Sequence, residues 1–392
     1  MRIGMVHYSE FEIDGRLQRQ ARALAERGDV VESLCLSRPS ETRVGDGLIR
    51  LHHVPSRQRR GGPASYLAQY GRFFLSAMRR LSALDRERPF DLIEIHNMPN
   101  FLALAALRPK LRGVPVILNV HDTFAELFAT KYDVGMDHRL VRLIEQEERW
   151  SSAFADVMIT VTDEARLHLN RRGVGNGRTR VVMNSPDRRF FGPPRPPVRI
   201  PASGEVRVVY HGGTARRFGV ETLVEAMALL TDRVPEATLR VYGSFRGDHS
   251  VRALAERIAP DRVWVSPDPV PVDRIAERIA GGHIGVVPTL DDVFTQLLLP
   301  VKLLEYVHLG IPAVVARLPA IERYFGDDEV RYFEPGSARS LADAIVAVRA
   351  DRDGAAERAL RASDKLATFD WDRQRAVYLA LIDELAGREG GR

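Results

Sequence analysis

The 392-residue chain has little of what several classes of protein depend on. Its single cysteine, Cys35, lies in the apolar run Val30–Leu36, which is typical of a small buried side chain. One cysteine excludes an intramolecular disulfide and a cysteine-rich metal site, so we expect a cytoplasmic location. No apolar run is long enough to span a bilayer, and the chain opens on a strand-like segment, Ile3–His7, rather than on a secretory signal.

Acidic residues are absent between Asp46 and Asp85, where seven arginines fall. Five apolar or aromatic side chains recur there at helical spacing: Leu67, Tyr70, Phe74, Met78 and Leu81. We favour a helix that packs this stripe on a sheet with its arginines in water, and the alternative is a helix that lies on an anionic membrane. No recognised nucleic-acid-binding module accompanies the arginines, so we expect no nucleic-acid partner.

Strand-like and helical patterns alternate from end to end, as in parallel α/β sheets. The predicted strands are Ile3–His7, Val30–Leu36, Leu92–Asn97, Val116–His121, Val157–Val161 and Arg180–Asn184, then Val206–His211, Thr238–Tyr242, Val263–Ser266, Ile284–Pro288, Ala313–Ala316 and Val330–Phe333. A proline-dense stretch, Phe191–Pro197, continues neither element and separates the two sets. We therefore predict two doubly wound, Rossmann-like domains, residues 1–190 and 204–368, joined by a linker at 191–203. Ligands would bind at the carboxyl ends of the strands, in a cleft between the domains.

The segment from Pro300 to Val315 carries the most specific pattern. Apolar residues recur at helical spacing up to Gly310, a helix stop, and a run typical of a buried parallel strand follows. Lys302 and Glu305 lie one turn apart, near the helix N-terminus. A cation, free backbone N–H groups and a carboxylate at this spacing suit a nucleoside diphosphate, with its phosphates and vicinal hydroxyls. The alternative is an ordinary ion pair on a solvated helix, although lysine before glutamate is the weaker order.

A glycine pair, Gly212 and Gly213, stands between a predicted strand and a predicted helix. Glycine lets backbone N–H groups approach a phosphate, although Gly-Gly at such a place is also an ordinary turn. Arg216 and Arg217 add positive charge that matches a diphosphate. We predict that these four residues bind phosphate together with Lys302.

Polar side chains also follow predicted strands of the first half. His121 stands beside Asp122 at the carboxyl end of a buried strand, where α/β sheets bind ligands, although most lone histidines are core residues. In the first strand-to-helix connection, Gly15 permits a diphosphate to come close and Arg16 can pair with it. The alternative there is a plain helix N-terminus capped by Asp14.

Five motifs, in order along nearly the whole chain, resemble those of glycosyltransferase family four, retaining enzymes with the GT-B fold. They are Phe90–Asn97 with its His96-Asn97 pair, Val116–Asp122 with Glu126 following, Val181–Pro186, Tyr210–Thr214 and Pro300–Val315. The pattern departs from the family where Gly213 and Phe218 replace an arginine and a lysine. It departs again at Leu297, eight positions before Glu305, where the family commonly has a glutamate that contacts the donor sugar. The identity of the donor sugar is therefore left open.

The resemblance implies a GT-B architecture in which two domains face a central cleft and a C-terminal helical segment, 369–392, crosses back to the first domain. It implies a retaining transferase that moves a hexose from a nucleoside-diphosphate sugar, with UDP or GDP, without a metal or other cofactor. The implied donor-binding residues are Gly15, Arg16, Gly212, Gly213, Arg216, Arg217, Lys302 and Glu305. His121 and Asp122 would be catalytic, and Asp14, His96 and Asn97 would lie on the acceptor side.

The acceptor is left open as a glycan, a lipid-linked saccharide or a small molecule. We favour polysaccharide or cell-envelope synthesis and leave open a peripheral association with the inner face of the membrane through residues 47–84. The alternatives are glycosylation of a secondary metabolite in solution, a catalytically inactive GT-B subunit, a nucleotide-sugar epimerase and a basic membrane- or nucleic-acid-binding protein. We predict no metal site, because the pairs at 351–353 and 370–372 stand at helix edges, where aspartates cap.

Overall fold

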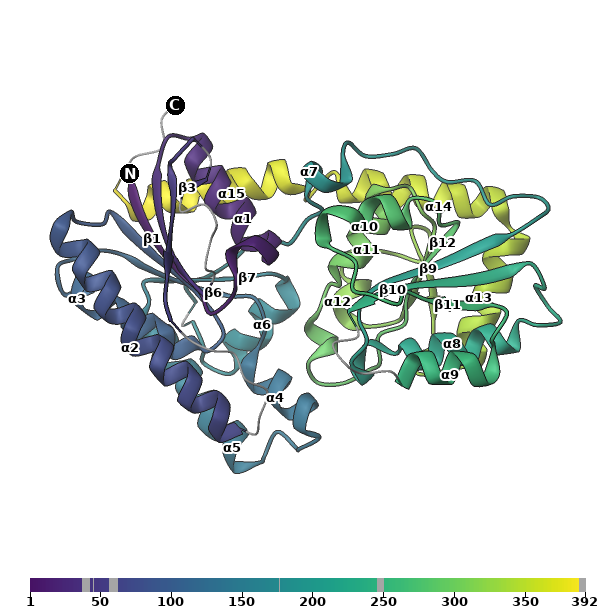
Figure 1. Ribbon diagram of the computed structural model, residues 1–392, viewed down its shortest axis with the longest axis horizontal. Helices are drawn as coiled ribbons and strands as arrows, with labels where there is room; N and C mark the ends of the chain where they lie inside the picture. Colours follow the sequence, from purple (N-terminus) through teal and green to yellow (C-terminus); the bar gives the residue numbers. More distant parts are fainter. Residues whose placement is uncertain (37–42, 45, 56–62, 176, 245–249, 388–392) are drawn as a thin grey trace. The chain divides into compact units, whose positions relative to one another are not determined.

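The chain divides into two compact units, Met1–Asn184 with Asp372–Arg392, and Ser185–Trp371 (Figure 1). The computed structural model describes residues 1–36, 43–44, 46–55, 63–175, 177–244 and 250–387. Each unit is built on its own sheet. The proline-dense stretch predicted as a linker belongs to the second unit, where the N–H groups of Arg195 and Val198 donate to the carbonyls of His308 and Gly310 at 2.9 and 2.7 Å.

The first unit contains an eight-stranded sheet in the order β3-β4-β2-β1-β5-β6-β7-β8. Its strands are β1 (Arg2–Val6), β2 (Val30–Cys35), β3 (Arg43–Val44), β4 (Ile49–His53), β5 (Leu92–His96), β6 (Val116–Val120), β7 (Val157–Thr160) and β8 (Thr179–Val181). All pairs are parallel except β3 with β4, the two strands that the sequence pattern did not predict. The strand order reverses between β1 and β5, where doubly wound sheets form a ligand crevice.

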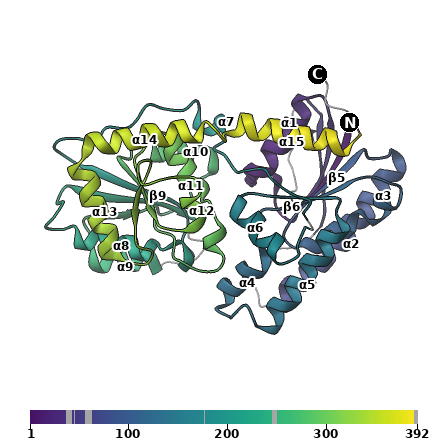
Figure 2. The ribbon, with the colours of Figure 1, turned by 180° about the vertical axis from the view of Figure 1, so that it is seen from behind.

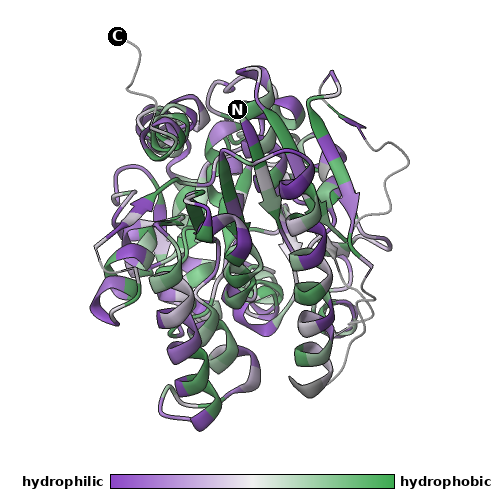
Figure 3. Ribbon diagram, turned by 90° about the vertical axis from the view of Figure 1, so that its left-hand side faces the viewer, coloured by the Kyte–Doolittle hydropathy of each residue, from purple (hydrophilic) through white to green (hydrophobic). Residues whose placement is uncertain are grey.

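Helices cover both faces of this sheet. They are η1 (Phe11–Ile13), α1 (Gly15–Glu26), α2 (Pro63–Glu87), η2 (Asn100–Ala106), α3 (Leu107–Leu111), α4 (Phe124–Tyr132), α5 (Arg139–Phe154), α6 (Asp163–Arg171) and α15 (Trp371–Leu385). One core lies under α2 and η2 and the other under α1 and α15. Hydrophobic and hydrophilic residues alternate along these helices, because each has one face on a core and one in water (Figure 3).

The apolar stripe of α2 is rotated from the predicted one. Phe73, Ala77 and Leu81 are fully buried against the sheet, and of these only Leu81 belongs to the predicted set. Leu67, the first residue of the predicted stripe, is 66% exposed. The arginines of α2 are exposed to water. Three further arginines of the predicted basic stretch fall at 56–62, outside the described residues.

The C-terminal helix α15 packs beside α1 in the first unit (Figures 1 and 2). The hydroxyl of Tyr378 donates to Glu94 at the centre of the sheet, at 2.5 Å. Gln374 accepts from the backbone N–H of Met183 at 2.8 Å, and Asp383 pairs with Arg27 at 2.9 Å. The C-terminal helix is thereby fixed to β5, to the end of α1 and to the segment after β8.

The second unit contains a six-stranded parallel sheet in the order β11-β10-β9-β12-β13-β14. Its strands are β9 (Val206–Gly213), β10 (Ala237–Ser244), β11 (Val263–Val265), β12 (Ile284–Val287), β13 (Ala313–Ala316) and β14 (Arg331–Phe333). Its helices are α7 (Arg188–Phe191), η3 (Arg216–Phe218), α8 (Val220–Leu229), α9 (Ser250–Ile258), α10 (Val272–Ile279), η4 (Thr295–Leu297), α11 (Val301–His308), α12 (Pro319–Glu322), α13 (Ala338–Ala350) and α14 (Arg352–Leu366). Its strand order reverses between β9 and β12.

A glycine brings α11 close to this reversal point. A Cβ atom on Gly285 in β12 would lie 2.5 Å from the ring of Tyr306, so only glycine lets that ring pack on the strand. The close packing fixes the N-terminal turn of α11, with Lys302, beside the end of β9.

None of the helices in the described ranges has the length and apolar character that crossing a membrane requires. Nor do the described side chains include a cluster of three or more histidine, cysteine, aspartate or glutamate residues that could hold a metal ion.

Candidate functional site

The first candidate residues lie where β1 passes into α1. Asp14 is the N-cap of α1, and its carboxylate accepts from the N–H of Leu17 and the hydroxyl of Ser9, both at 3.2 Å. Burial acts to raise the pKa of Asp14, but the neighbouring groups, of which the charge of Arg16 has the largest effect, outweigh burial and hold the pKa below its ordinary value. The structure therefore contains the capped helix N-terminus that was the predicted alternative. The Asp14 carboxylate and the Arg16 guanidinium lie in this connection after β1.

Gly15 has room for a larger residue. A Cβ atom there would lie 3.9 Å from its nearest neighbour, a guanidinium nitrogen of Arg19. The backbone therefore does not require glycine at this position.

His96 and His121 form a buried, stacked pair at the ends of β5 and β6. His96 Nδ1 and His121 Nε2 lie 2.9 Å apart, and the ring centroids lie 5.2 Å apart. Burial lowers the pKa of His96 to about 4. Burial, together with the positive charge of Arg16, also lowers the pKa of His121 well below its ordinary value. Both rings are therefore neutral at neutral pH, and each carries one N–H.

Glu94 decides where those protons sit. Its Oε1 lies 3.6 Å from His96 Nε2, and the carboxylate accepts from Asn119 Nδ2 at 2.6 Å and from the Tyr378 hydroxyl. A carboxylate there favours the His96 tautomer with the proton on Nε2, so that His96 Nδ1 accepts from His121 Nε2–H. His121 Nδ1 is then a lone-pair acceptor, and it has no hydrogen-bond partner within the described part of the chain. The pair therefore leaves one buried acceptor without a donor among the described residues.

Asn97 ties these strand ends together. Its Oδ1 accepts from the N–H of His121 at 2.8 Å, and its Nδ2 donates to the carbonyl of Asp122 at 2.7 Å. The sequence-predicted residues of the first unit thus gather at the carboxyl ends of β1, β5 and β6.

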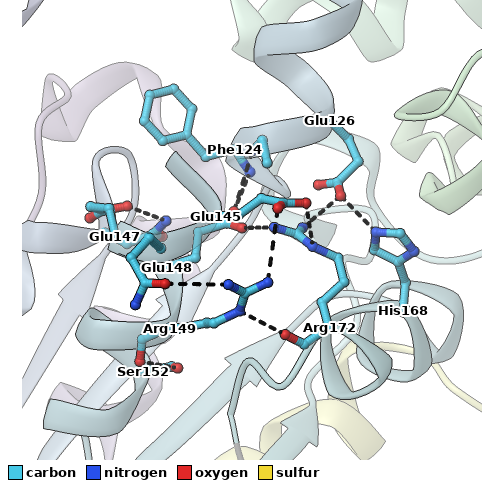
Figure 4. A network of polar contacts seen from close by, with 12 residues as sticks. Phe124, Glu126, Glu145, Glu147, Glu148, Arg149, Ser152, His168 and Arg172 are labelled. Carbon is cyan, nitrogen blue, oxygen red and sulfur yellow. Dashed lines mark hydrogen bonds and ion pairs between the residues drawn. The ribbon is translucent and has the colours of Figure 1, made fainter. Parts of the chain in front are cut away.

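A buried ionic network supports the turn after Asp122 (Figure 4). Glu148 Oε1 accepts from the N–H of Phe124, at the start of α4, at 3.0 Å. Arg172 pairs with Glu148 at 2.5 Å and with Glu126 at 2.6 Å, and His168 contacts Glu126 at 2.6 Å. One guanidinium therefore holds α4, α5 and α6 together directly behind the candidate site.

In the second unit, Lys302 lies in the first turn of α11 against the end of β9. Its Nζ donates to the hydroxyl of Tyr210 at 2.9 Å and lies 4.3 Å from the centroid of that ring and 4.9 Å from that of Phe218. The Tyr210 hydroxyl in turn donates to the carbonyl of Gly213. Burial lowers the pKa of Lys302 to about 7, against the opposing effect of Glu305. A buried lysine amine of this kind takes up a proton readily when an anion lies beside it.

Glu305 lies one turn further along α11 and faces the same strand end. Its Oε2 is 3.1 Å from His211 Nε2. The N–H of His211 donates to the hydroxyl of Tyr306 at 3.2 Å, so α11 is fixed to β9 on both sides of this carboxylate.

The glycine pair belongs to β9 rather than to a turn after it. Gly212 has a φ of +113°, which disfavours any other residue, and a Cβ atom there would lie 3.4 Å from Lys302 Nζ. A Cβ atom on Gly213 would lie 3.0 Å from the ring of Phe218. Arg217 lies half-buried over that ring at 4.9 Å, whereas Arg216 is exposed. The structure thus brings Gly212, Gly213, Arg217 and Lys302 together and places Arg216 in water.

Sequence reasoning missed three groups that shape these sites: Tyr210, His211 and the Glu94–Tyr378 pair. Glu94 carried a signal, since a carboxylate inside a buried apolar strand needs buried donors. Tyr210 and His211 lie in the family motif Tyr210–Thr214, but nothing local in the sequence gave their contacts with α11, and Tyr378 looks like an ordinary residue of an apolar helix face.

Two family models match the chain. The model described as a glycosyl transferase 4-like domain matches residues 13–185, and the model of glycosyl transferases group 1 matches residues 205–351. A D-inositol 3-phosphate glycosyltransferase of Arthrobacter sp. (strain FB24) is 24% identical over 382 residues, which cover 93% of this chain and 89% of that protein.

Solved structures share the fold over almost the whole chain. A sucrose-phosphate synthase from Thermosynechococcus elongatus superposes with a TM-score of 0.78 at 18% identity, covering 99% of this chain and all of that one. Anabaena Alr3699/HepE, solved in complex with UDP-glucose, superposes with a TM-score of 0.70 at 14% identity, covering 98% of this chain and all of that one.

Proposed function

The chain is a glycosyltransferase of family four with the GT-B fold, and from this premise we propose that it moves a hexose from a nucleoside-diphosphate sugar to an acceptor hydroxyl with retention of configuration. The observation that carries the proposal is the Lys302–Tyr210–Gly213 arrangement at the end of β9. It supplies a cation, a helix N-terminus and glycine backbone at one place, which is what a diphosphate needs.

In the proposed donor complex, Lys302, Arg217 and the backbone at Gly212 and Gly213 hold the diphosphate, and Glu305 accepts from the ribose hydroxyls. Gly15 and Arg16 are proposed as further donor-binding residues. A structural neighbour holds UDP-glucose, which makes UDP-sugars the first donors to test, with GDP-sugars second. Leu297 is buried, so it adds no polar contact to the donor sugar and leaves that sugar open.

In the proposed reaction the bond from the anomeric carbon to the phosphate oxygen breaks as the acceptor oxygen bonds to the same face of that carbon. The acceptor proton passes to the departing phosphate, so no protein nucleophile or metal takes part. His121 Nδ1 accepts from a hydroxyl of the transferred sugar, and Asp122 stands beside it. His96, Asn97 and Asp14 hold this side of the site, and the protein contributes positioning and electrostatics.

Replacing Glu305 by alanine is expected to weaken donor-nucleotide binding roughly 10- to 100-fold, because the ribose hydroxyls lose a charged acceptor. Glu225→Ala, an exposed carboxylate on α8, is the matched control and should bind like the wild type. Isothermal titration with UDP and GDP measures both. Equal affinities in the two variants would remove Glu305 from the donor site.

Donor binding is expected to weaken as the pH rises from 7 to 9. The pKa of Lys302 is lowered to about 7 in the free protein, and a bound diphosphate would raise it towards its ordinary value. Below pH 7 the ammonium is already charged, whereas above it each complex must take up a proton, so affinity falls by up to about tenfold per pH unit. Titrations in buffers of different ionisation enthalpy would detect the uptake, and binding without proton uptake at pH 8 would contradict this account.

The proposed role lies in polysaccharide or cell-envelope synthesis at the inner face of the membrane, with a glycan or lipid-linked acceptor. Exposed arginines on α2 support attraction to anionic lipid. Thermal-shift measurements with a panel of UDP-, GDP- and dTDP-sugars, followed by anomeric analysis of the product, test the function. Selective stabilisation without hydrolysis or transfer would indicate an inactive binding subunit instead, and inversion at the anomeric carbon would refute retention.

A further inference from the structure

An apolar pocket opens in the first unit among α2, η2, α4 and α5. Its volume is about 260 Å³, and six aromatic side chains line it: Tyr66, Tyr70, Phe101, Phe124, Phe128 and Tyr132. A cavity of roughly 150 Å³ accommodates one benzene ring, so this pocket has room for a longer hydrocarbon.

The walls of the pocket are held in place by ring-to-ring contacts. Phe128 and Tyr132 lie 4.5 Å apart between centroids, and Tyr70 meets Tyr8 edge-on at 4.9 Å. Phe101 meets Phe74 edge-on at 5.7 Å. The pocket is therefore preformed, as small-molecule sites commonly are.

Two charged side chains line the pocket in the part of the chain that the structure describes, and they differ in setting. Lys131 is exposed, and its Nζ lies 4.6 Å from the ring centroid of Tyr66 and 5.4 Å from that of Tyr132, so a cation is held at the mouth. Glu147 is half-buried, accepts from Asn100 Nδ2 at 3.3 Å, and has its pKa raised to about 7 by burial. The mouth suits an anion and the interior suits hydrocarbon.

The pocket adjoins the histidine pair along the chain. Met98 and Phe124 line it, and they follow Asn97 and Asp122 by one and two residues. Three leucines that line the pocket are nevertheless exposed to water: Leu67 at 66%, Leu143 at 61% and Leu140 at 43%. Covering these exposed apolar side chains with a hydrocarbon removes apolar surface from water and therefore favours binding.

We propose that this pocket binds the hydrocarbon chain of an amphiphilic lipid acceptor, with an anionic group of that lipid at Lys131. A hydrocarbon chain suits the volume and the exposed leucines better than a single ring does. Lys131, the cation that lines the pocket among the described residues, matches one anionic head. That the bound lipid is the acceptor of the sugar rests on the proposed function. The pocket itself rests on the geometry alone.

Binding of n-decyl phosphate, below its micelle-forming concentration, tests the proposal by isothermal titration. Leu67→Asp places a carboxylate at the pocket, and Leu75→Asp makes the same change at a 45% exposed leucine of α2 that does not line it. We expect wild type and Leu75→Asp to bind alike, and Leu67→Asp and Lys131→Glu to bind at least tenfold more weakly. Equal binding by Leu67→Asp and Leu75→Asp, or tighter binding of phenyl phosphate than of decyl phosphate, would overturn it.

A parallel titration with UDP and GDP separates the two proposals. Nucleotide binding without decyl phosphate binding overturns the lipid pocket and leaves the transferase function standing. Decyl phosphate binding with the expected variant pattern, but no nucleotide binding and no sugar transfer, supports the pocket and overturns the proposed function.

Discussion

Replacing Arg172 by methionine is expected to lower the free energy of unfolding of the first unit by about 3–5 kcal/mol, because it removes the cation that neutralises buried carboxylates. Arg172 lies 2.6 Å from Glu126 and 2.5 Å from Glu148, and both carboxylates are almost wholly inaccessible to water (Figure 4). Burial raises the pKa of Glu148, and Arg172 opposes the rise. Without the guanidinium, two like charges would face each other in a dry interior.

The loss should depend on pH in a defined direction. In the variant, Glu126 and Glu148 would have raised pKa values in the folded state, so the deficit would be full at neutral pH and smaller in acid, where folding no longer has to bury charge. Arg171→Met is the control, since Arg171 is exposed and its side chain reaches the Leu167 carbonyl at 3.4 Å. Urea denaturation at pH 7.5 and pH 5 measures both variants. A loss below 1 kcal/mol, or a deficit that grows in acid, would contradict the role given to Arg172.

Replacing Lys302 by methionine is expected to lower the turnover of sugar transfer or donor hydrolysis 100- to 1000-fold, because the departing diphosphate loses a positioned cation. Lys302 contacts the Tyr210 hydroxyl at 2.9 Å and lies over the rings of Tyr210 and Phe218. A methionine fits the same apolar walls without the cost of a desolvated ammonium. Thermal stability should therefore stay equal or rise while activity falls.

Lys365→Met is the matched control, because Lys365 is exposed on α14 in the same unit and takes no part in the site. Steady-state kinetics with a UDP-sugar, together with a thermal melt of each variant, distinguishes a role of the Lys302 charge in the reaction from a role of Lys302 in stability. If Lys302→Met lost stability and activity together, Lys302 would be a structural residue of α11 and the proposed diphosphate contact would be wrong.

The predicted α/β class with two doubly wound sheets is confirmed. Strands buried on both faces produce continuous apolar runs, which is why segments such as Ala313–Ala316 were recognisable without a structure. Strand β4, which lies between β2 and the edge strand β3, was missed because its sequence, with two histidines and an arginine, shows no such run. Helical spacing likewise placed Lys302 and Glu305 on one face of α11.

The apolar face of α2 was predicted at the wrong angle for a related reason. The helix is aromatic or apolar on more than one side, so periodicity alone allowed several stripes. Packing against the sheet selected Phe73, Ala77 and Leu81, and the side that was left over, with Leu67, became the rim of a pocket.

The sequence by itself therefore determined the fold class, the family and the segments that carry the candidate site, because each is written in spacing within one strand or helix. The tertiary structure alone decided which groups meet. Lys302 finds its hydrogen-bond partner Tyr210 at a separation of 92 residues, and Glu94 finds Tyr378 at 284. Local periodicity indicates the type of an element and its possible apolar faces. The charge, tautomer and pKa of a buried group depend on distant neighbours that only the packed sheets bring to it.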